Sequence, residues 1–301
     1  MDFLSAIFAT RQLRALKALL AALLAAAEML GLLLFDLPTT PRGPALDLSK
    51  FELVWADEFN GDELDVSKWS PHFTWGSTIR RGGWWNTAFQ SVGGGSLKIR
   101  TEYQPEGFGG GQPGYYSCAF DTNGRYLQKF GYFEVRCMLP KGQGQWAAFW
   151  MLNDGMFQVD GSGRDGMEID IFEAPYYHKN GLERNAVTTN IHYDGYGSGH
   201  RMEAVGKFRV PDPYDTFNTY GLEWNEHEYI FYINGVETAR STFGGVSQEP
   251  EYMILSVEVD GSGGVPAPGW SGDIRNNTLL PSAFVVDYVR VYQYKDLADG
   301  G

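Results

Sequence analysis

The chain has 301 residues and a formal net charge of −13 at pH 7. This excess of acidic residues argues against a nucleic-acid partner, and it would repel a strongly anionic ligand at long range unless a local basic patch overrode that repulsion. The sequence contains no phosphate-binding Gly-Lys-Ser/Thr loop, no dinucleotide fingerprint and no Cys/His pattern with zinc spacing.

Residues 1–41 differ in composition from the rest of the chain. Basic residues precede a run of Leu and Ala between Ala18 and Phe35. This order is typical of a secretory signal, of a membrane anchor, or of an amphipathic helix that lies on a protein or membrane surface. We expect an apolar helix outside the catalytic fold, and a protein that is secreted to the extracellular space or anchored to a membrane through this segment.

A linker at residues 42–49 leads to one large domain at residues 50–296, and a short tail follows at 297–301. The domain is rich in Gly and aromatic residues, with β-branched residues in short runs, which predicts an all-β sandwich. In chain order the predicted strands are residues 51–59, 93–103, 115–122, 130–139, 145–152, 187–193, 219–224, 228–233, 236–241, 252–259 and 283–293, besides the strand that contains Glu168.

Cys118 and Cys137 are the two cysteines of the chain. They lie on two predicted strands joined through residues 122–129, so a disulfide between them is geometrically allowed. Two cysteines do not make a disulfide scaffold in a chain of this size, and a pair of buried thiols is the favoured interpretation.

The stretch that leads to Glu173 carries three carboxylates among Ile and Phe residues, which predicts a buried strand. Alternation puts Glu168 and Asp170 on one face, but it would turn Glu173 towards the core. Burying a lone carboxylate there is costly. One β-bulge near Ile171-Phe172 would return Glu173 to the face of Glu168, so we predict three carboxylates in a row on a bulged strand.

Such a row suits acid/base chemistry on a glycosidic bond. Retaining glycosidases need two carboxyl groups about 5–5.5 Å apart, one as nucleophile and one as general acid/base. Strand neighbours two residues apart lie about 6.6–6.8 Å apart along the axis, so a bulged strand can supply this spacing. A third carboxylate between the pair would push their pKa values apart. Spacing alone leaves open a solvated acidic face or a Ca²⁺ or Mg²⁺ site.

The hexapeptide Glu168-Ile169-Asp170-Ile171-Phe172-Glu173 matches the E-x-D-x-x-E signature of glycoside hydrolase family 16 in its bulged branch. Other segments resemble strands of this family in the family's order, over roughly residues 50–293; they are 51–61, 131–136, 146–152, 220–224 and 287–292. The resemblance implies a two-sheet antiparallel jelly roll of the concanavalin A-like lectin/glucanase type. A substrate cleft would cross its concave sheet.

By this resemblance Glu168 would be the nucleophile, Glu173 the general acid/base, and Asp170 the carboxylate that tunes them. The reaction would be endo-hydrolysis of a β-linked polysaccharide with retention, and catalysis would need no cofactor. The favoured substrate is a β-1,3- or β-1,3/1,4-glucan. The alternatives are a β-galactanase of the agarase, carrageenase or porphyranase type, a transglycosylase, and a non-catalytic glucan-binding lectin on the same fold.

Aromatic and polar residues near this row are predicted to bind the polysaccharide, because sugar rings stack on aromatic faces while hydroxyls need polar partners. They are Arg80, Trp84, Trp85, Asn86, Trp146, Trp150, His192 and Trp270. The segment at 83–86 resembles one of the family's β-1,3-glucanases, from which Trp85 and Ala88 depart. The two basic residues Arg80 and Arg81, next to these aromatic residues, leave a sulfated polysaccharide as an alternative substrate. Core positions for one or two of the tryptophans are the competing interpretation.

Glu58 and Asp287 occupy positions near which many family members bind a structural Ca²⁺. Ordinary capping or turn roles for these carboxylates are the alternative. We expect the protein to be a monomer whose partner is a polysaccharide substrate. Any contact with a membrane would be made through the N-terminal helix.

Overall fold

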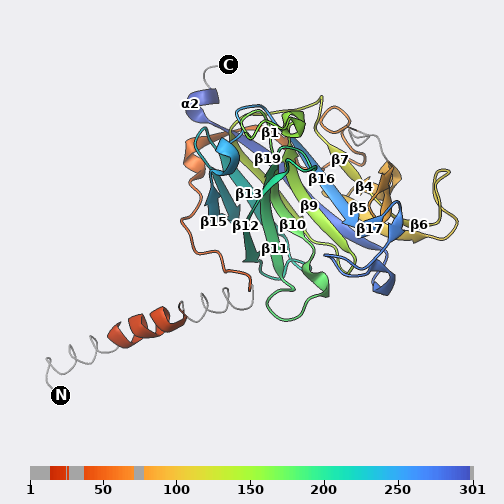
Figure 1. Cartoon of the computed structure of the whole chain (residues 1–301), viewed down its shortest axis with the longest axis horizontal. Coiled ribbons are helices and arrows are strands. Elements are labelled where there is room, and N and C mark those ends of the chain that lie inside the picture. The colour runs from red at the N-terminus through yellow and green to blue at the C-terminus, as the bar shows by residue number, and fades with distance from the viewer. Residues whose placement is uncertain (1–13, 25, 27–36, 71–77, 299–301) are drawn as a thin grey trace, which may run out of the picture. The chain divides into compact units, whose positions relative to one another are not determined.

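The computed structural model describes residues 14–24, 26, 37–70 and 78–298. The chain divides into two compact units, Met1–Thr39 and Thr40–Gly301 (Figure 1). In the first unit, residues 14–24 are helical and their leucines are exposed. The remainder of the predicted apolar helix, at 1–13 and 27–36, lies outside the described residues. No helix in the described part is long and apolar enough to cross a bilayer.

The second unit is built from a sheet of eleven strands and a sheet of six. The larger sheet contains β1 (Phe51–Asp57), β2 (Ile79–Arg80), β3 (Gly83–Trp85), β4 (Gln90–Val92), β5 (Leu97–Gln104), β6 (Gly114–Ser117), β8 (Gly131–Met138), β13 (Asn218–Trp224), β14 (Tyr229–Ile233), β15 (Val236–Ser241) and β19 (Ser282–Tyr294). The smaller sheet has the order β12 (Arg201–Arg209), β11 (Ala186–Tyr193), β10 (Glu168–Ala174), β9 (Gln145–Leu152), β16 (Tyr252–Val259) and β7 (Ala119–Asp121).

Short elements fill the connections of this unit. The strands β17 (Gly261–Ser262) and β18 (Val265–Pro266) pair with each other. The 3₁₀ helices are η1 (Leu48–Lys50), η2 (Thr87–Phe89), η3 (Asp154–Phe157), η4 (Tyr176–His178), η5 (Phe243–Gly245) and η6 (Ile274–Asn276), and α2 (Lys295–Ala298) follows the last strand. Among the strand pairs of the two large sheets, β3 with β6 is the parallel one. The predicted jelly-roll sandwich is confirmed.

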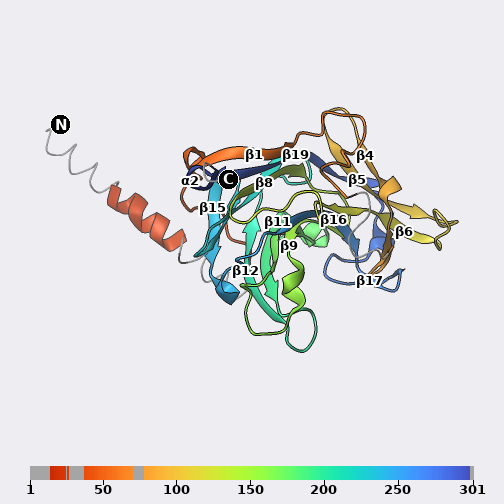
Figure 2. The same ribbon diagram turned by 90° about the horizontal axis from the view of Figure 1, so that it is seen from above.

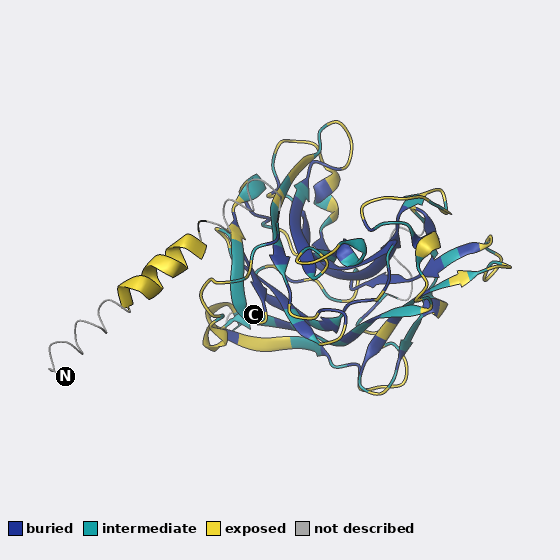
Figure 3. Cartoon of the chain, turned by 90° about the horizontal axis from the view of Figure 1, so that it is seen from below, coloured by how far each residue is buried: buried dark blue, intermediate teal, exposed yellow. Residues whose placement is uncertain are grey.

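The two sheets stack face to face, with β1, β8 and β19 in one layer and β9, β11 and β16 in the other (Figure 2). Alternate side chains of each central strand meet between the layers, where the buried strands are dark blue in Figure 3. From β9 this core receives Ala147, Phe149 and Met151. Cys118 and Cys137 also lie in it as free, buried thiols, so no disulfide joins them.

The opposite face of β9 is buried as well. It carries Trp146, Ala148, Trp150 and Leu152, which form a second buried cluster with residues that include Trp85. The strict alternation along β9 therefore separates a packed core face from an aromatic face. The aromatic face is the one on which the carboxylates of β10 lie.

The strand assignment differs from the sequence prediction in several places, among them the short strands β2, β3, β4, β17 and β18, which were not predicted. Residues 115–122 were expected to form one strand, but the chain crosses from the larger sheet to the smaller one at Cys118. Tyr116, Cys118 and Phe120 all enter the same core, so the alternating pattern runs through the crossing unbroken. Strand β12 was not predicted, because it is an edge strand with few buried residues and little β-branched character.

Candidate active site

A bulge in β10 places the three carboxylates on one face. The pairing of β10 with both neighbours is regular up to Asp170 and shifts before Phe172 on β9 and before Glu173 on β11. Ile171 and Phe172 are consecutive, yet both lie in the core between the sheets. The predicted bulge is therefore confirmed, and it returns Glu173 to the face that carries Glu168 and Asp170.

The neighbouring strand β11 holds this irregular backbone in place. The hydroxyl of Thr189 donates to the carbonyl of Ile171 at 3.1 Å, which satisfies an acceptor at the bulge. One residue further along β11, the amide of Asn190 donates to Oε2 of Glu173 at 2.7 Å. Asn190 thus fixes the orientation of the third carboxylate.

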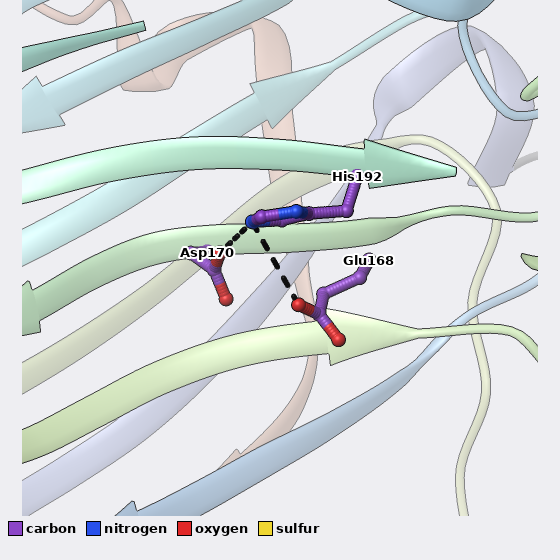
Figure 4. A group of neighbouring side chains, drawn as sticks. All are labelled: Glu168, Asp170 and His192. Carbon is purple, nitrogen blue, oxygen red and sulfur yellow. Dashed lines mark ion pairs between the residues drawn. The ribbon is translucent and has the colours of Figure 1, made fainter. Parts of the chain in front are cut away.

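His192 lies between the other two carboxylates (Figure 4). Its Nε2 is 3.2 Å from Oδ2 of Asp170 and 3.9 Å from Oε1 of Glu168. Its Nδ1 is 2.9 Å from Nε2 of His200, and the two imidazole rings are stacked. On the other side, the hydroxyl of Tyr196 donates to Oε2 of Glu168.

The carboxyl groups of the row resist ionisation. Burial raises the pKa of Glu168 to about 8, and the nearby charge of Asp170 adds to the effect. Burial also raises the pKa of Asp170, to which the charge of Glu258 contributes. The pKa of Glu173 is raised well above its usual range by burial and then by Asp170. At neutral pH the row therefore retains protons that exposed carboxyl groups would lose.

Surrounding groups distinguish the two ends of the row. His192, Tyr196 and Arg80 each lower the pKa of Glu168, whereas for Glu173 the hydrogen bond from Asn190 acts in this direction against burial and three neighbouring carboxylates. Glu168 is consequently the end that ionises more readily, and Glu173 is the end that keeps its proton. A carboxyl group whose ionisation is favoured, on the same strand face as one that holds its proton more tightly, is the combination that retaining glycoside hydrolysis requires.

The predicted tryptophans occupy different positions. Trp146 and Trp150 lie on the face of the carboxylates, each 5% exposed, and Nε1 of Trp150 donates to the hydroxyl of Ser256 at 3.1 Å. Trp85 is also buried there, and its Nε1 donates to the carbonyl of Val257 at 2.9 Å. Trp84 packs against the main core instead.

The other predicted binding residues are closer to the surface. The ring of Trp270 is 40% exposed and meets that of Trp146 edge to face, with their centroids 5.6 Å apart. Asn86 caps η2, because its side-chain oxygen accepts from the backbone amide of Ala88 at 2.9 Å. The structure thus brings Trp85, Trp146, Trp150 and His192 to the carboxylate face, and it gives Asn86 a structural hydrogen bond.

Arg80 and Arg81 are both paired with buried acidic residues. Nε of Arg80 donates to Oε1 of Glu258 at 2.5 Å, while Arg81 reaches Glu258 at 3.5 Å and Asp260 at 3.3 Å. Their guanidinium groups lie over aromatic rings, Arg80 over Trp85 and Arg81 over Trp146. Two positive charges are thus matched by two negative charges beside the catalytic face.

The two residues predicted near a structural Ca²⁺ are each paired with a different arginine. Glu58 accepts two hydrogen bonds from Arg290, at 2.8 and 2.9 Å, and Asp287 accepts one from Arg136. This arrangement does not offer a shared set of free oxygen ligands, although calcium binding stays a prediction. Among the described residues, the one group of three candidate donors is Glu168, Asp170 and His192. These three donors, one of which is a nitrogen, are fewer than the roughly six to eight oxygen ligands that Ca²⁺ takes in proteins.

Comparison with known proteins agrees with this geometry. A family model described as "Beta-porphyranase A-D, GH16 domain" matches residues 52–294. The chain belongs to glycoside hydrolase family 16. It is therefore a glycoside hydrolase, and the family recognised from the E-x-D-x-x-E hexapeptide is confirmed.

Individual relatives of this family 16 chain have several activities. It is 29% identical to a β-glucanase of Rhodothermus marinus, over 81% of this chain and 86% of that protein. It is also 29% identical to an endo-1,3-1,4-β-glycanase of Rhizobium meliloti, of whose length it spans 53%. The catalytic domain of an endo-1,3-β-glucanase (laminarinase) from Thermotoga petrophila superposes with a TM-score of 0.64 at 27% identity, covering 83% of this chain and 99% of that domain.

Sequence reasoning missed four polar residues around the catalytic row, namely Asn190, Tyr196, His200 and Glu258. Asn190 had a signal, since it precedes His192 by two residues on a predicted strand and so shares its face. Tyr196 and His200 lie in the connection between β11 and β12, where no periodic pattern points a side chain at a partner. Glu258 was visible on its strand, but only the fold shows that its partner is Arg80.

Glu251 supports the start of the catalytic strand of this family 16 enzyme. Its side chain is 1% exposed, and Oε1 accepts from the backbone amide of Met167, the residue before Glu168, at 3.3 Å. Burial raises the pKa of Glu251 from 4.5 to about 8. The folded state therefore binds the proton more tightly than the unfolded chain does, so this contribution to stability is present below pH 4.5 and is lost as the pH rises towards 8.

We expect Glu251→Gln to flatten the decline in unfolding free energy between pH 5 and pH 8, by on the order of 1 kcal/mol per pH unit. Urea unfolding at several pH values measures this slope. Glu249→Gln is the matched control, because Glu249 is exposed and its removal should leave the slope unchanged. Parallel slopes for the wild type and Glu251→Gln would show that Glu251 is already ionised in the folded protein.

Proposed function

We propose that this family 16 enzyme hydrolyses internal bonds of a β-glucan, either β-1,3-linked or mixed β-1,3/1,4-linked, with retention of configuration. The observation that carries the proposal is the row of Glu168, Asp170 and Glu173 on one face of the bulged strand β10. A binding module on this fold has no need of three carboxyl groups in a row on one strand face. The row therefore favours an enzyme over a lectin.

In the proposed reaction Glu168 attacks the anomeric carbon and Glu173 gives its proton to the departing glycosidic oxygen. A covalent glycosyl-enzyme results, in which Glu168 is an ester and Glu173 a carboxylate. Glu173 then takes a proton from water, and the resulting nucleophile releases the sugar. Asp170 has a tuning role, since negative charge on it raises the pKa of Glu173 and so favours the protonated acid.

A neutral substrate is supported by the charges around the row. The chain carries a formal charge of −13, so a polyanion would be repelled at long range. Locally, the guanidinium groups of Arg80 and Arg81 are neutralised by Glu258 and Asp260. The arginines therefore serve to hold these buried carboxylates, and no excess positive charge remains at this position for a sulfate group.

A sulfated β-galactan is the second candidate substrate. It is favoured by one observation, that the family model matching residues 52–294 is described as that of β-porphyranases. The catalytic steps would be the same for this substrate, because the carboxylate row does not depend on which sugar flanks the bond. The difference would lie in the residues that surround the row.

Product release from laminarin, lichenan, agarose, κ-carrageenan and porphyran tests the proposal, with Glu168→Ser as the inactive control. We expect oligosaccharides from laminarin or lichenan, and initial products of the β-anomer by NMR. Activity confined to porphyran would identify the sulfated galactan as the substrate and would leave the proposed catalytic steps unchanged. Transfer of glycosyl units to added oligosaccharide, with little reducing sugar released, would identify a transglycosylase. Binding without turnover by the wild type would contradict hydrolysis and favour a lectin.

A further inference from the structure

Tyr196 is in contact with the carboxylate at the nucleophile end of the row, although it belongs to a surface loop. It lies between β11 and β12 and is 53% exposed overall. Its hydroxyl nevertheless donates to Oε2 of Glu168, which is 7% exposed. His192 faces the other oxygen, Oε1, at 3.9 Å. The two oxygens of Glu168 therefore have different surroundings.

The loop that carries Tyr196 is anchored at its base. The carboxylate of Asp194 is buried and accepts from the backbone amides of Asp160 and Gly161, at 3.2 and 3.1 Å. The next residue, Gly195, donates its amide to the carbonyl of Met156 at 2.7 Å. These bonds join the loop to the segment before the catalytic strand, so the loop position is set by backbone contacts as well as by Tyr196.

The ring of Tyr196 is held by two aromatic neighbours. Its centroid lies 5.9 Å from that of Phe157 and 5.9 Å from that of His200, both in edge-to-face arrangements. These contacts belong to the ring and not to the hydroxyl. A change from Tyr to Phe would therefore keep the packing and remove the hydrogen bond alone.

We propose that Tyr196 is a positioning residue for the nucleophile, whose hydroxyl holds Oε2 of Glu168 so that Oε1 is the oxygen that attacks the sugar. The inference rests on the proposed hydrolysis and deepens it. A hydrogen bond that favours the ionised carboxylate also lowers the pKa of Glu168, in the same direction as His192 and Arg80. Tyr196 thus determines both the orientation and the ionisation of the nucleophile.

The hydrogen bond affects the two steps of the reaction differently. In the first step Oε1 forms the bond to the anomeric carbon, the glycosidic bond breaks, and Glu173 gives its proton to the leaving oxygen. Glu168 becomes a neutral ester whose carbonyl oxygen is Oε2. In the second step the oxygen of a water molecule bonds to the anomeric carbon while Glu173 takes a proton from that water, the bond from Oε1 to carbon breaks, and the carboxylate of Glu168 regains its negative charge. Because hydrogen bonds to charged acceptors are the stronger ones, Tyr196 stabilises the charge that returns in this second step.

Tyr196→Phe is therefore expected to slow hydrolysis of the glycosyl-enzyme more than its formation. We expect kcat to fall about 10- to 100-fold, the range that a hydrogen bond to a charged group supplies. KM should fall with kcat, because the covalent intermediate accumulates. The acidic limb of the kcat/KM profile should move to higher pH, since Glu168 loses a group that favours its ionised form.

The experiment has one readout that needs no substrate. The pKa of Glu168 is measured in the wild type and in Tyr196→Phe from the titration of ¹³C-labelled glutamate carboxyl carbons, with Glu168→Gln to assign the signal. Kinetics and the fraction of covalent intermediate, by quenched-flow mass spectrometry on an activated aryl β-glycoside, form the second readout. Tyr103→Phe is the matched control, because it removes a hydroxyl from an exposed tyrosine of β5 that contacts Tyr115.

A higher pKa of Glu168 and an accumulating intermediate in Tyr196→Phe, with Tyr103→Phe unchanged, would support the inference. An unchanged pKa of Glu168 in the folded Tyr196→Phe variant would overturn it. An equal loss of kcat and kcat/KM without a change in the pH profile would also overturn it, since that pattern indicates a structural role only. If the wild type hydrolyses none of the polysaccharides or glycosides, the proposed function fails, whereas the titration still decides whether Tyr196 controls Glu168.

Discussion

Replacing Glu168 with alanine is expected to lower hydrolysis by on the order of 10⁴-fold or more, because the covalent route is lost. The variant should recover turnover of an activated aryl β-glycoside when sodium azide is added. The missing carboxylate leaves room for a small anion, which attacks the anomeric carbon from the side that Glu168 occupied. One displacement inverts the configuration, so the product is expected to be the α-glycosyl azide.

Glu173→Ala is the matched variant at the other end of the row. An activated leaving group departs without protonation, so the glycosyl-enzyme still forms on Glu168. Its hydrolysis slows by about 10²- to 10⁴-fold, because no base activates water. Azide needs no base, and it should attack the intermediate in a second displacement that gives the β-glycosyl azide.

The anomer of the azide product, measured by NMR, thus assigns each carboxylate to its role. The opposite pair of anomers would exchange the roles of Glu168 and Glu173. Full activity in both alanine variants would remove the row from catalysis. Both residues sit on a strand whose other face is core, so circular dichroism and the Tm serve to confirm that each variant is folded.

Arg80→Met is expected to destabilise the fold by about 2 kcal/mol, because it leaves the carboxylate of Glu258 with only its longer contact to Arg81. Glu258 is 5% exposed and cannot regain the lost partner from water without a rearrangement. The same change should move the acidic limb of activity to higher pH. Arg80 lowers the pKa of Glu168 and Glu258 raises that of Asp170, so an unbalanced Glu258 disfavours ionisation of the row.

The double variant Arg80→Met/Glu258→Gln distinguishes a lost ion pair from lost packing. It removes both charges and is expected to recover most of the stability, as measured by urea unfolding. Arg100→Met provides the surface comparison, since Arg100 and Glu102 form a more exposed pair at 2.9 Å; its effect should stay within about 0.5 kcal/mol. Equal destabilisation by Arg80→Met and the double variant would show that packing of the guanidinium group over Trp85, and not the ion pair, is what matters.

Patterns of alternation allowed the central strands and the catalytic row to be predicted from the sequence. The bulge followed from a physical conflict, because Glu173 would otherwise be buried among apolar side chains. The crossing at Cys118 could not be predicted, since a single core receives side chains from both sheets and the period of two is not interrupted there. The signature hexapeptide supplied the chemical interpretation of the row.

Contacts between distant segments were outside the reach of these patterns. Arg80 and Glu258 are 178 residues apart, and no local rule links an arginine of β2 to a glutamate of β16, which belongs to the other sheet. The sequence therefore suggested that Arg80 was a ligand for sugar, whereas the fold supplies an ion-pair partner. The contact of Tyr196 with Glu168 was missed for the same reason, because the partner of a loop side chain is known only once the loop has been placed in the fold.

One strand carries all three carboxylates of the proposed reaction, whereas the groups around them come from elsewhere in the chain. The separation of Glu168 and Glu173 is determined within six residues of β10 and by the bulge between them. Insertions or substitutions in the loops near Trp85, Tyr196 or Trp270 leave that separation unaltered. In this architecture the residues that react with the bond and the residues that surround the substrate can therefore change independently during evolution.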